Sequence, residues 1–174
     1  MGEFIYLNEI IRFSMGILLV VAAYSKTIGY RQFIDTLASS FHLNRVLSLV
    51  VAPTVIAVEW GVGLILVVYP PMGYWAIGAA LVMFLLFTLA VSFMLYRDGF
   101  VKCNCFGAED RPVSLADIVR NIICILAMLF YLQTTHSVSA LAIESSILIF
   151  VTAISIAFIL VNFHRVVSIL NKAD

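Results

Sequence analysis

The chain alternates between long apolar stretches and short polar connections. A helix needs about 20 mostly apolar residues to cross the hydrocarbon core of a bilayer. Five stretches meet that requirement, at residues 5–25, 47–69, 73–96, 114–133 and 141–163. The pattern therefore predicts an all-α fold, a polytopic membrane bundle of about five transmembrane helices. Gly61 and Gly63 lie in the second stretch, where small residues permit close contact between helices.

Two connections carry a pattern of their own. Residues 30–43 predict an interfacial amphipathic helix in the headgroup region, because their apolar side chains fall on one helical face: Phe33, Ile34, Leu37, Ala38 and Phe41. Residues 97–113 contain Cys103 and Cys105, and we call them the cysteine segment. The other connections are short.

Composition supports the membrane assignment. Of 174 residues, 63% are hydrophobic and 11% are charged, whereas a soluble domain has roughly 25% charged residues. The amino terminus has Glu3 and Glu9 where a cleaved signal would be basic, so we expect a first spanning helix and a single integral membrane domain over residues 1–174. No basic run with interleaved aromatic residues suggests nucleic-acid binding.

The basic residues are distributed unevenly between the connections. With five spans, nine of the ten lie on or near one side of the membrane, which is also the side of the cysteine segment: Lys26, Arg31, Arg45, Arg97, Lys102, Arg111, Arg120, Arg165 and Lys172. The positive-inside rule then predicts a multi-pass protein of the cell membrane with this side in the cytoplasm.

The motif with the most chemical content is Cys103-Asn104-Cys105. Two cysteines one residue apart can form a disulfide only if the backbone bends at Asn104. A strained and exposed disulfide is easily reduced, and Lys102 beside it favours the thiolate that attacks in disulfide exchange. The alternatives are two ordinary loop cysteines, or a metal site. No metal is expected, because two sulfurs without a neighbouring histidine leave a zinc site two ligands short.

Two charged residues lie within the apolar stretches. Counted from the connection that their helices share, Arg12 is about 13 residues deep and Glu59 about 12. Antiparallel helices would bring them level, and each charge would cost a few kcal/mol if it were unpaired. We therefore predict an ion pair between Arg12 and Glu59. It could be a structural bridge or a participant in catalysis.

Further candidates lie near the helix ends that face the cysteine segment. Lys26 and Arg120 could lower a thiol pKa, stabilise a thiolate or bind a quinone oxygen, and Asn121 could add a hydrogen bond. The alternative is that both cations extend to lipid headgroups. Cys124 lies one turn beyond Arg120 and is either an inert core cysteine or a third redox thiol.

The chain resembles the MauE family of methylamine utilisation, within the broader DoxX-like group of redox-associated membrane proteins. The resemblance covers most of residues 5–133 and rests on these residues: Arg12, Ser25-Lys26, Tyr30-Arg31-Gln32-Phe33, Glu59-Trp60-Gly61-Val62-Gly63-Leu64, Cys103-Asn104-Cys105-Phe106-Gly107 and Arg120-Asn121. The family often has Gly between the two cysteines, where this chain has Asn104. The resemblance implies a core of four helices.

The resemblance also implies a function, namely thiol–disulfide exchange during maturation of a partner protein, often beside a thioredoxin-like protein. Cys103 and Cys105 would be the exchanging pair, with Lys26, Glu59 and Arg120 in support, and quinone is a candidate acceptor. Two alternatives remain: a non-enzymatic membrane subunit or chaperone, and a quinone- or lipid-binding protein with a structural Cys-X-Cys. Disulfide formation usually takes place outside the cytoplasm, which conflicts with the side that the charges predict.

Overall fold

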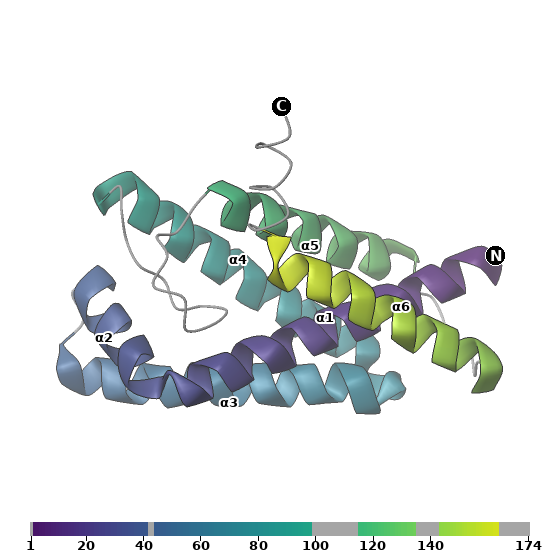
Figure 1. Cartoon of the computed structure of the whole chain (residues 1–174), viewed down its shortest axis with the longest axis horizontal. Coiled ribbons are helices and arrows are strands. Elements are labelled where there is room, and N and C mark those ends of the chain that lie inside the picture. Colours follow the sequence, from purple (N-terminus) through teal and green to yellow (C-terminus); the bar gives the residue numbers. More distant parts are fainter. Residues whose placement is uncertain (1, 42–43, 99–114, 135–142, 164–174) are drawn as a thin grey trace.

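The computed structural model describes residues 2–41, 44–98, 115–134 and 143–163, and within these ranges the chain is helical (Figure 1). All five apolar stretches and the amphipathic stretch are confirmed as helices, with ends that differ from the prediction by a few residues. In chain order the elements are α1 (Gly2–Ile28), α2 (Tyr30–Phe41), α3 (Arg45–Val68), the short 3-10 helix η1 (Pro70–Met72), α4 (Gly73–Asp98), α5 (Leu115–Thr134) and α6 (Ile143–Val161).

Four of the described helical segments are long and apolar enough to cross a membrane. They are Ile5–Ile28, Arg45–Val68, Pro70–Tyr96 and Leu115–Thr134. The fifth predicted span corresponds to α6, whose described apolar part, Ile147–Val161, is shorter than a full crossing requires. The chain is therefore a helical membrane bundle, with four full-length spans in its described part and a further apolar helix.

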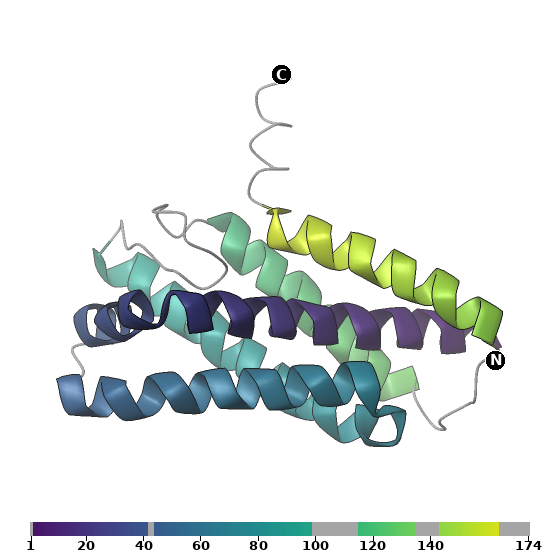
Figure 2. The same cartoon turned by 60° about the horizontal axis from the view of Figure 1, so that its bottom comes forward.

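Helix α1 is the central element of the bundle. It lies between α3 on one side and α6 on the other, and it also contacts α4 and α5 (Figures 1 and 2). Half of its most apolar window is buried, compared with 22–28% for α3, α4 and α5. Helix α1 is therefore the most buried of the four spans, whereas α3, α4 and α5 present most of their surface outward, as expected for helices surrounded by lipid.

Two glycines bring α1 and α3 close together. A Cβ atom added at Gly63 would lie 3.1 Å from the backbone oxygen of Gly16 and 3.1 Å from the backbone nitrogen of Val20. One added at Gly16 would lie 3.1 Å from the oxygen of Gly63. The predicted role in close contact is thus confirmed for Gly63. It is wrong for Gly61, whose Cβ position has no atom within 4 Å.

These two neighbouring glycines make a matched pair of variants. We expect Gly63→Ala to lower the free energy of unfolding by about 1–3 kcal/mol, because the new methyl group meets backbone atoms that cannot move aside. Gly61→Ala, in the same helix, is expected to raise the free energy of unfolding by up to about 1 kcal/mol, because alanine has the higher helix propensity and its methyl group meets no atom. Unfolding of the purified protein in mixed dodecyl maltoside and SDS micelles measures both values. Equal stability of the two variants would contradict the assigned contact.

Helix α2 follows α1 with almost no break in hydrogen bonding. The backbone N–H of Gly29 donates to Ser25 and that of Phe33 donates to Gly29, both at 2.9 Å. The chain changes direction here, and α2 lies across the start of α3 (Figure 1). Its buried side chains Phe33 and Ile34 pack against Ala52 and Ile56 of α3. The amphipathic helix is thus confirmed, with its apolar face against α3; its interfacial position stays a prediction.

Candidate functional site

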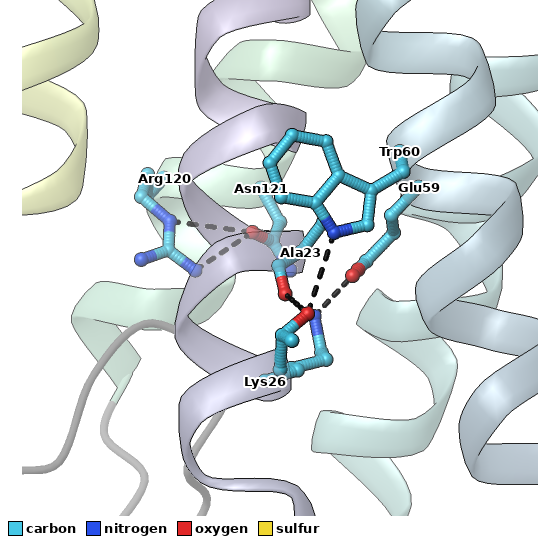
Figure 3. Close-up of polar contacts among 7 residues, drawn as sticks. Ala23, Lys26, Glu59, Trp60, Arg120 and Asn121 are labelled. Atoms are coloured by element: carbon cyan, nitrogen blue, oxygen red, sulfur yellow. Dashed lines mark hydrogen bonds and ion pairs between the residues drawn. The ribbon is translucent and has the colours of Figure 1, made fainter.

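A buried ion pair joins α1 to α3. The Nζ atom of Lys26 lies 2.5 Å from Oε1 of Glu59, and the two side chains are 1% and 0% exposed. Side chains on a helix tilt toward its amino terminus. Because α1 and α3 are antiparallel, Lys26 and Glu59 tilt toward one another, and Figure 3 shows them meeting between the two helices. Lys26 therefore does not extend to lipid headgroups.

Aromatic rings cover the ammonium group of Lys26. Its Nζ atom lies 4.9 Å from the ring centre of Phe87 on α4 and 5.7 Å from that of Phe33 on α2. Both distances are within the range of cation–π attraction. Residues of α1, α2, α3 and α4 thus meet at this cation, so the ion pair lies where four helices pack together.

The second oxygen of Glu59 is an unsatisfied acceptor. Oε2 is buried and has no hydrogen-bond partner among the described residues. A buried acceptor without a partner costs about 1–3 kcal/mol, and more when it is charged. This atom can accept a hydrogen bond or a proton without displacing any existing bond.

A short chain of hydrogen bonds adjoins the pair. Nε1 of Trp60 donates to the hydroxyl of Thr27 at 3.3 Å, and that hydroxyl lies 2.7 Å from the carbonyl oxygen of Ala23, to which it donates. Trp60 and Thr27 are the sequence neighbours of Glu59 and Lys26. The bonds therefore tie the backbone segments that carry the ion pair to each other and hold its geometry.

Helix α5 contributes a second polar group. Arg120 and Asn121 are both buried, and Nη2 of Arg120 donates to Oδ1 of Asn121 at 3.1 Å. Asp117, one turn earlier, lies 3.7 Å from Nη1 of Arg120. Asn121 thus accepts a hydrogen bond from Arg120 (Figure 3), and a hydrogen bond from Asn121 to a thiol or a quinone stays a prediction. Helices α1 and α5 are in contact, and Figure 3 shows the α5 group beside the part of α1 that carries Ala23 and Lys26.

Cys124 lies on the same helix as Arg120 and is completely buried. It belongs to the main apolar cluster, together with Leu18 and Leu19 of α1 and Met128 of α5. This environment is typical of a structural cysteine and favours that interpretation over a third redox thiol.

The predicted ion pair between Arg12 and Glu59 is wrong. Arg12 instead pairs with Glu9, one turn earlier on α1, with its Nη2 atom 2.5 Å from Oε2. It also donates to the carbonyl oxygen of Leu66, and its guanidinium lies 4.2 Å from the ring centre of Phe13. Arg12 is therefore satisfied at a different level of the bundle and does not contribute to the Lys26–Glu59 site.

The register of α1 against α3 explains this error. Gly16 lies opposite Gly63. Glu59 precedes Gly63 by four residues, so in antiparallel helices it faces the part of α1 that follows Gly16, toward Lys26. Arg12 precedes Gly16 by four residues and lies on the other side of the glycine contact. The two charges are thus displaced by about eight residues, or roughly 12 Å at 1.5 Å per residue.

Cys103 and Cys105 lie outside the described residues, as do Lys102 and Asn104. The described chain stops at Asp98, the end of α4, and resumes at Leu115, the start of α5. These two points are at the same end of the bundle as the end of α1 and the start of α3 (Figure 1). The cysteines themselves remain a prediction. Within the described residues, no group of three or more His, Cys, Asp or Glu side chains could hold a metal ion.

Sequence reasoning did not identify several neighbours of these charged residues. Glu9 and Asp117 are partners of Arg12 and Arg120, and each lies three residues before its arginine. Acid–base pairs at this spacing lie on the same helix face, so the signal was available. Phe87 carried no such signal, because its position beside Lys26 depends on how α4 packs.

Comparison with known proteins identifies one family. The model of the methylamine utilisation protein MauE matches residues 5–134. The matched region includes α1 from its fourth residue and all of α2 to α5, and therefore every residue of the site described above. No curated protein and no solved structure matches the chain.

Proposed function

The chain belongs to the MauE family of membrane proteins, which is linked to methylamine utilisation, and on this premise we propose that it is a thiol–disulfide redox protein. Cys103 and Cys105 form a disulfide reversibly and exchange it with a partner protein during maturation of that partner. The site comprises this pair together with the buried Lys26, Glu59 and Arg120.

One observation carries most of the proposal. Three charged side chains from three helices, Lys26, Glu59 and Arg120, are buried, and Figure 3 shows them in one region of the bundle. Lys26 is two residues from the end of α1, and Arg120 is five residues from the start of α5, where the described chain resumes after the cysteine segment. Charged groups within membrane helices are costly and are usually retained for function. A purely structural bridge would require two opposite charges, whereas here a second buried cation, Arg120 with its own partner Asp117, lies on a third helix, and Oε2 of Glu59 has no hydrogen-bond partner among the described residues.

The charges suit thiol chemistry. A nearby cation favours the thiolate over the thiol, and the thiolate is the species that attacks a disulfide or leaves from one. Lys26 and Arg120 supply two cations at this end of the bundle. Glu59 holds Lys26 in place, and its Oε2 atom, which has no partner among the described residues, can take up a proton released by a thiol.

The exchange balances as follows. A thiolate of the partner protein attacks one sulfur of the Cys103–Cys105 disulfide, which forms a mixed disulfide and releases the other cysteine as a thiolate. The second thiol of the partner, once deprotonated, attacks the mixed disulfide, so that the partner leaves with a disulfide and the chain retains two reduced cysteines. Two electrons pass from the partner to the chain.

The reduced pair must then be reoxidised. A quinone would accept two electrons and two protons from the two thiols and leave as a quinol, which regenerates the disulfide. A thioredoxin-like protein in its disulfide form would accept the same two electrons by a second exchange. Both acceptors are consistent with a cysteine pair at a membrane surface. The distribution of basic residues favours the cytoplasmic side for this surface.

Trapping of the mixed disulfide tests the proposal. We expect Cys103→Ser or Cys105→Ser, expressed in cells that contain the partner, to accumulate a covalent adduct that runs as a larger band without reductant and disappears with it. The remaining cysteine attacks the disulfide of an oxidised partner as a thiolate, which forms the mixed disulfide and releases one partner thiolate, in the reverse of the exchange above. In that direction the other cysteine of the chain would displace the partner, and the variant lacks it. The double Ser variant is the matched control and should give no adduct.

The same experiment separates the alternatives. A non-enzymatic subunit would co-purify with its partner equally well from the double Ser variant, and neither single variant would give a reductant-sensitive adduct. That result would contradict redox exchange. A Cys124→Ser variant should behave as the wild type, because this side chain is buried in the apolar core.

A further inference from the structure

A pocket lies between α2 and the start of α3, apart from the Lys26–Glu59 site. It is lined by Tyr30, Arg31, Ile34 and Asp35 of α2 and by Arg45 and Leu49 of α3. Its volume is about 560 Å³, within the range of small-molecule binding sites. Arg31 and Asp35 are one helical turn apart and therefore lie on the same face of α2.

The two arginines of the pocket have no counter-ion among the residues that the structure describes. Within the described part of the chain, neither Arg31 nor Arg45 forms an ion pair or a side-chain hydrogen bond, and both are exposed. Arg45 is also the first residue of α3, so the positive end of that helix dipole adds to the two side-chain charges. With Asp35 included, the pocket has a net charge of +1.

The surface beside the pocket is apolar and exposed. Val46, Leu49 and Val50 on the first two turns of α3 all have large exposed fractions. Arg45 begins a segment that is long and apolar enough to span the membrane, so we expect the pocket to lie at the level where headgroups meet acyl chains. An occupant would therefore have a charged part beside the arginines and a hydrocarbon part along α3.

We propose that this pocket binds the headgroup phosphate of an anionic phospholipid. A phosphate diester has one negative charge, which matches the net charge of the pocket, and arginine can bind its oxygens in a bidentate manner. The acyl chains lie along Val46 and Val50. The proposal is independent of the redox function, because it uses none of the residues of that site.

Native mass spectrometry of the purified full-length chain in detergent tests the proposal, with phosphatidylglycerol as the probe. We expect saturable binding that the double variant Arg31→Gln/Arg45→Gln weakens by roughly 25-fold, at about fivefold for each arginine near the membrane surface. Asp35→Asn removes the negative charge of the pocket and should strengthen binding about fivefold. Arg31→Lys/Arg45→Lys keeps both charges and should retain most of the affinity.

Two further ligands identify what the pocket recognises. Glycerol phosphate offers the phosphate without the chains, and phosphatidylethanolamine offers a headgroup without net charge; both should bind at least tenfold more weakly than phosphatidylglycerol. Equal affinity for glycerol phosphate would assign the pocket to a soluble phosphate compound and overturn the lipid proposal. Equal affinity of the wild type and the glutamine variant for phosphatidylglycerol, with the helical circular dichroism of both unchanged, would overturn it as well.

Discussion

Lys26→Met is expected to lower the free energy of unfolding of the bundle by about 3–5 kcal/mol, because it leaves the Glu59 carboxylate buried without its counter-charge. Glu59→Met should have a cost of similar size, since Lys26 then lacks its partner at a site where it is 1% exposed. Methionine is unbranched and similar in size to both residues, so the loss of charge rather than a loss of volume dominates the effect.

The double variant Lys26→Met/Glu59→Met distinguishes a pair interaction from two independent losses. Removal of both charges leaves neither one uncompensated, so we expect the double variant to regain most of the stability that each single variant loses. Unfolding in mixed dodecyl maltoside and SDS micelles, followed by circular dichroism, gives all four values. A double variant whose loss equals the sum of the single losses would contradict the ion pair.

The pair also has a role in the proposed redox function, which the double variant can reveal. If Lys26 and Glu59 only hold α1 against α3, the stable double variant should exchange disulfides at the wild-type rate. The proposed function predicts a slower rate instead, because one of the two cations near the cysteine segment and the Oε2 acceptor of Glu59 are lost together. Stability and exchange would then respond differently to the same substitution.

The second large effect concerns the cysteines themselves. Replacement of Cys103 and Cys105 together by serine is expected to abolish disulfide transfer, because a hydroxyl group can neither form a disulfide nor act as its leaving group. The third cysteine provides an internal control. Cys124→Ser should leave the transfer rate within about twofold of the wild type, because Cys124 is buried among apolar side chains.

The rate at which a reduced dithiol protein is oxidised measures this effect. The chain is supplied in vesicles with a quinone as the final electron acceptor, and a thioredoxin-like protein serves as the dithiol. Full transfer by the double Ser variant would end the redox hypothesis. Loss of transfer in Cys124→Ser with an unchanged circular dichroism spectrum would instead indicate that Cys124, inside the bundle, takes part in the disulfide transfer.

Sequence reasoning predicted the helices well because the bilayer constrains them strongly. A spanning segment must satisfy its backbone hydrogen bonds internally and present apolar side chains over about 20 residues. Those requirements appear directly in the sequence, and each predicted stretch is a helix within a few residues of its expected bounds. The amphipathic face of α2 was also recognisable from its periodicity, since Phe33 and Ile34 are buried.

The pairing of charges could not be predicted in the same way. Depth counted from a shared connection assumes that both helices begin at the same level, whereas the contact of Gly16 with Gly63 determines the register of α1 and α3. Lys26, assigned by its position near a helix end to a supporting role, is therefore the partner of Glu59. Such a register depends on three-dimensional packing, which a single sequence does not display.

A redox titration of the cysteine pair tests the central claim most directly. Membranes that contain the wild-type chain are equilibrated in glutathione buffers of graded potential and quenched in acid. Free thiols are then alkylated under denaturing conditions and counted by peptide mass spectrometry. The redox account predicts that Cys103 and Cys105 convert together from disulfide to two thiols over one two-electron transition, for which about 30 mV changes the ratio tenfold, while Cys124 remains a thiol throughout. A Cys103–Cys105 peptide that is fully alkylated at every potential would contradict it.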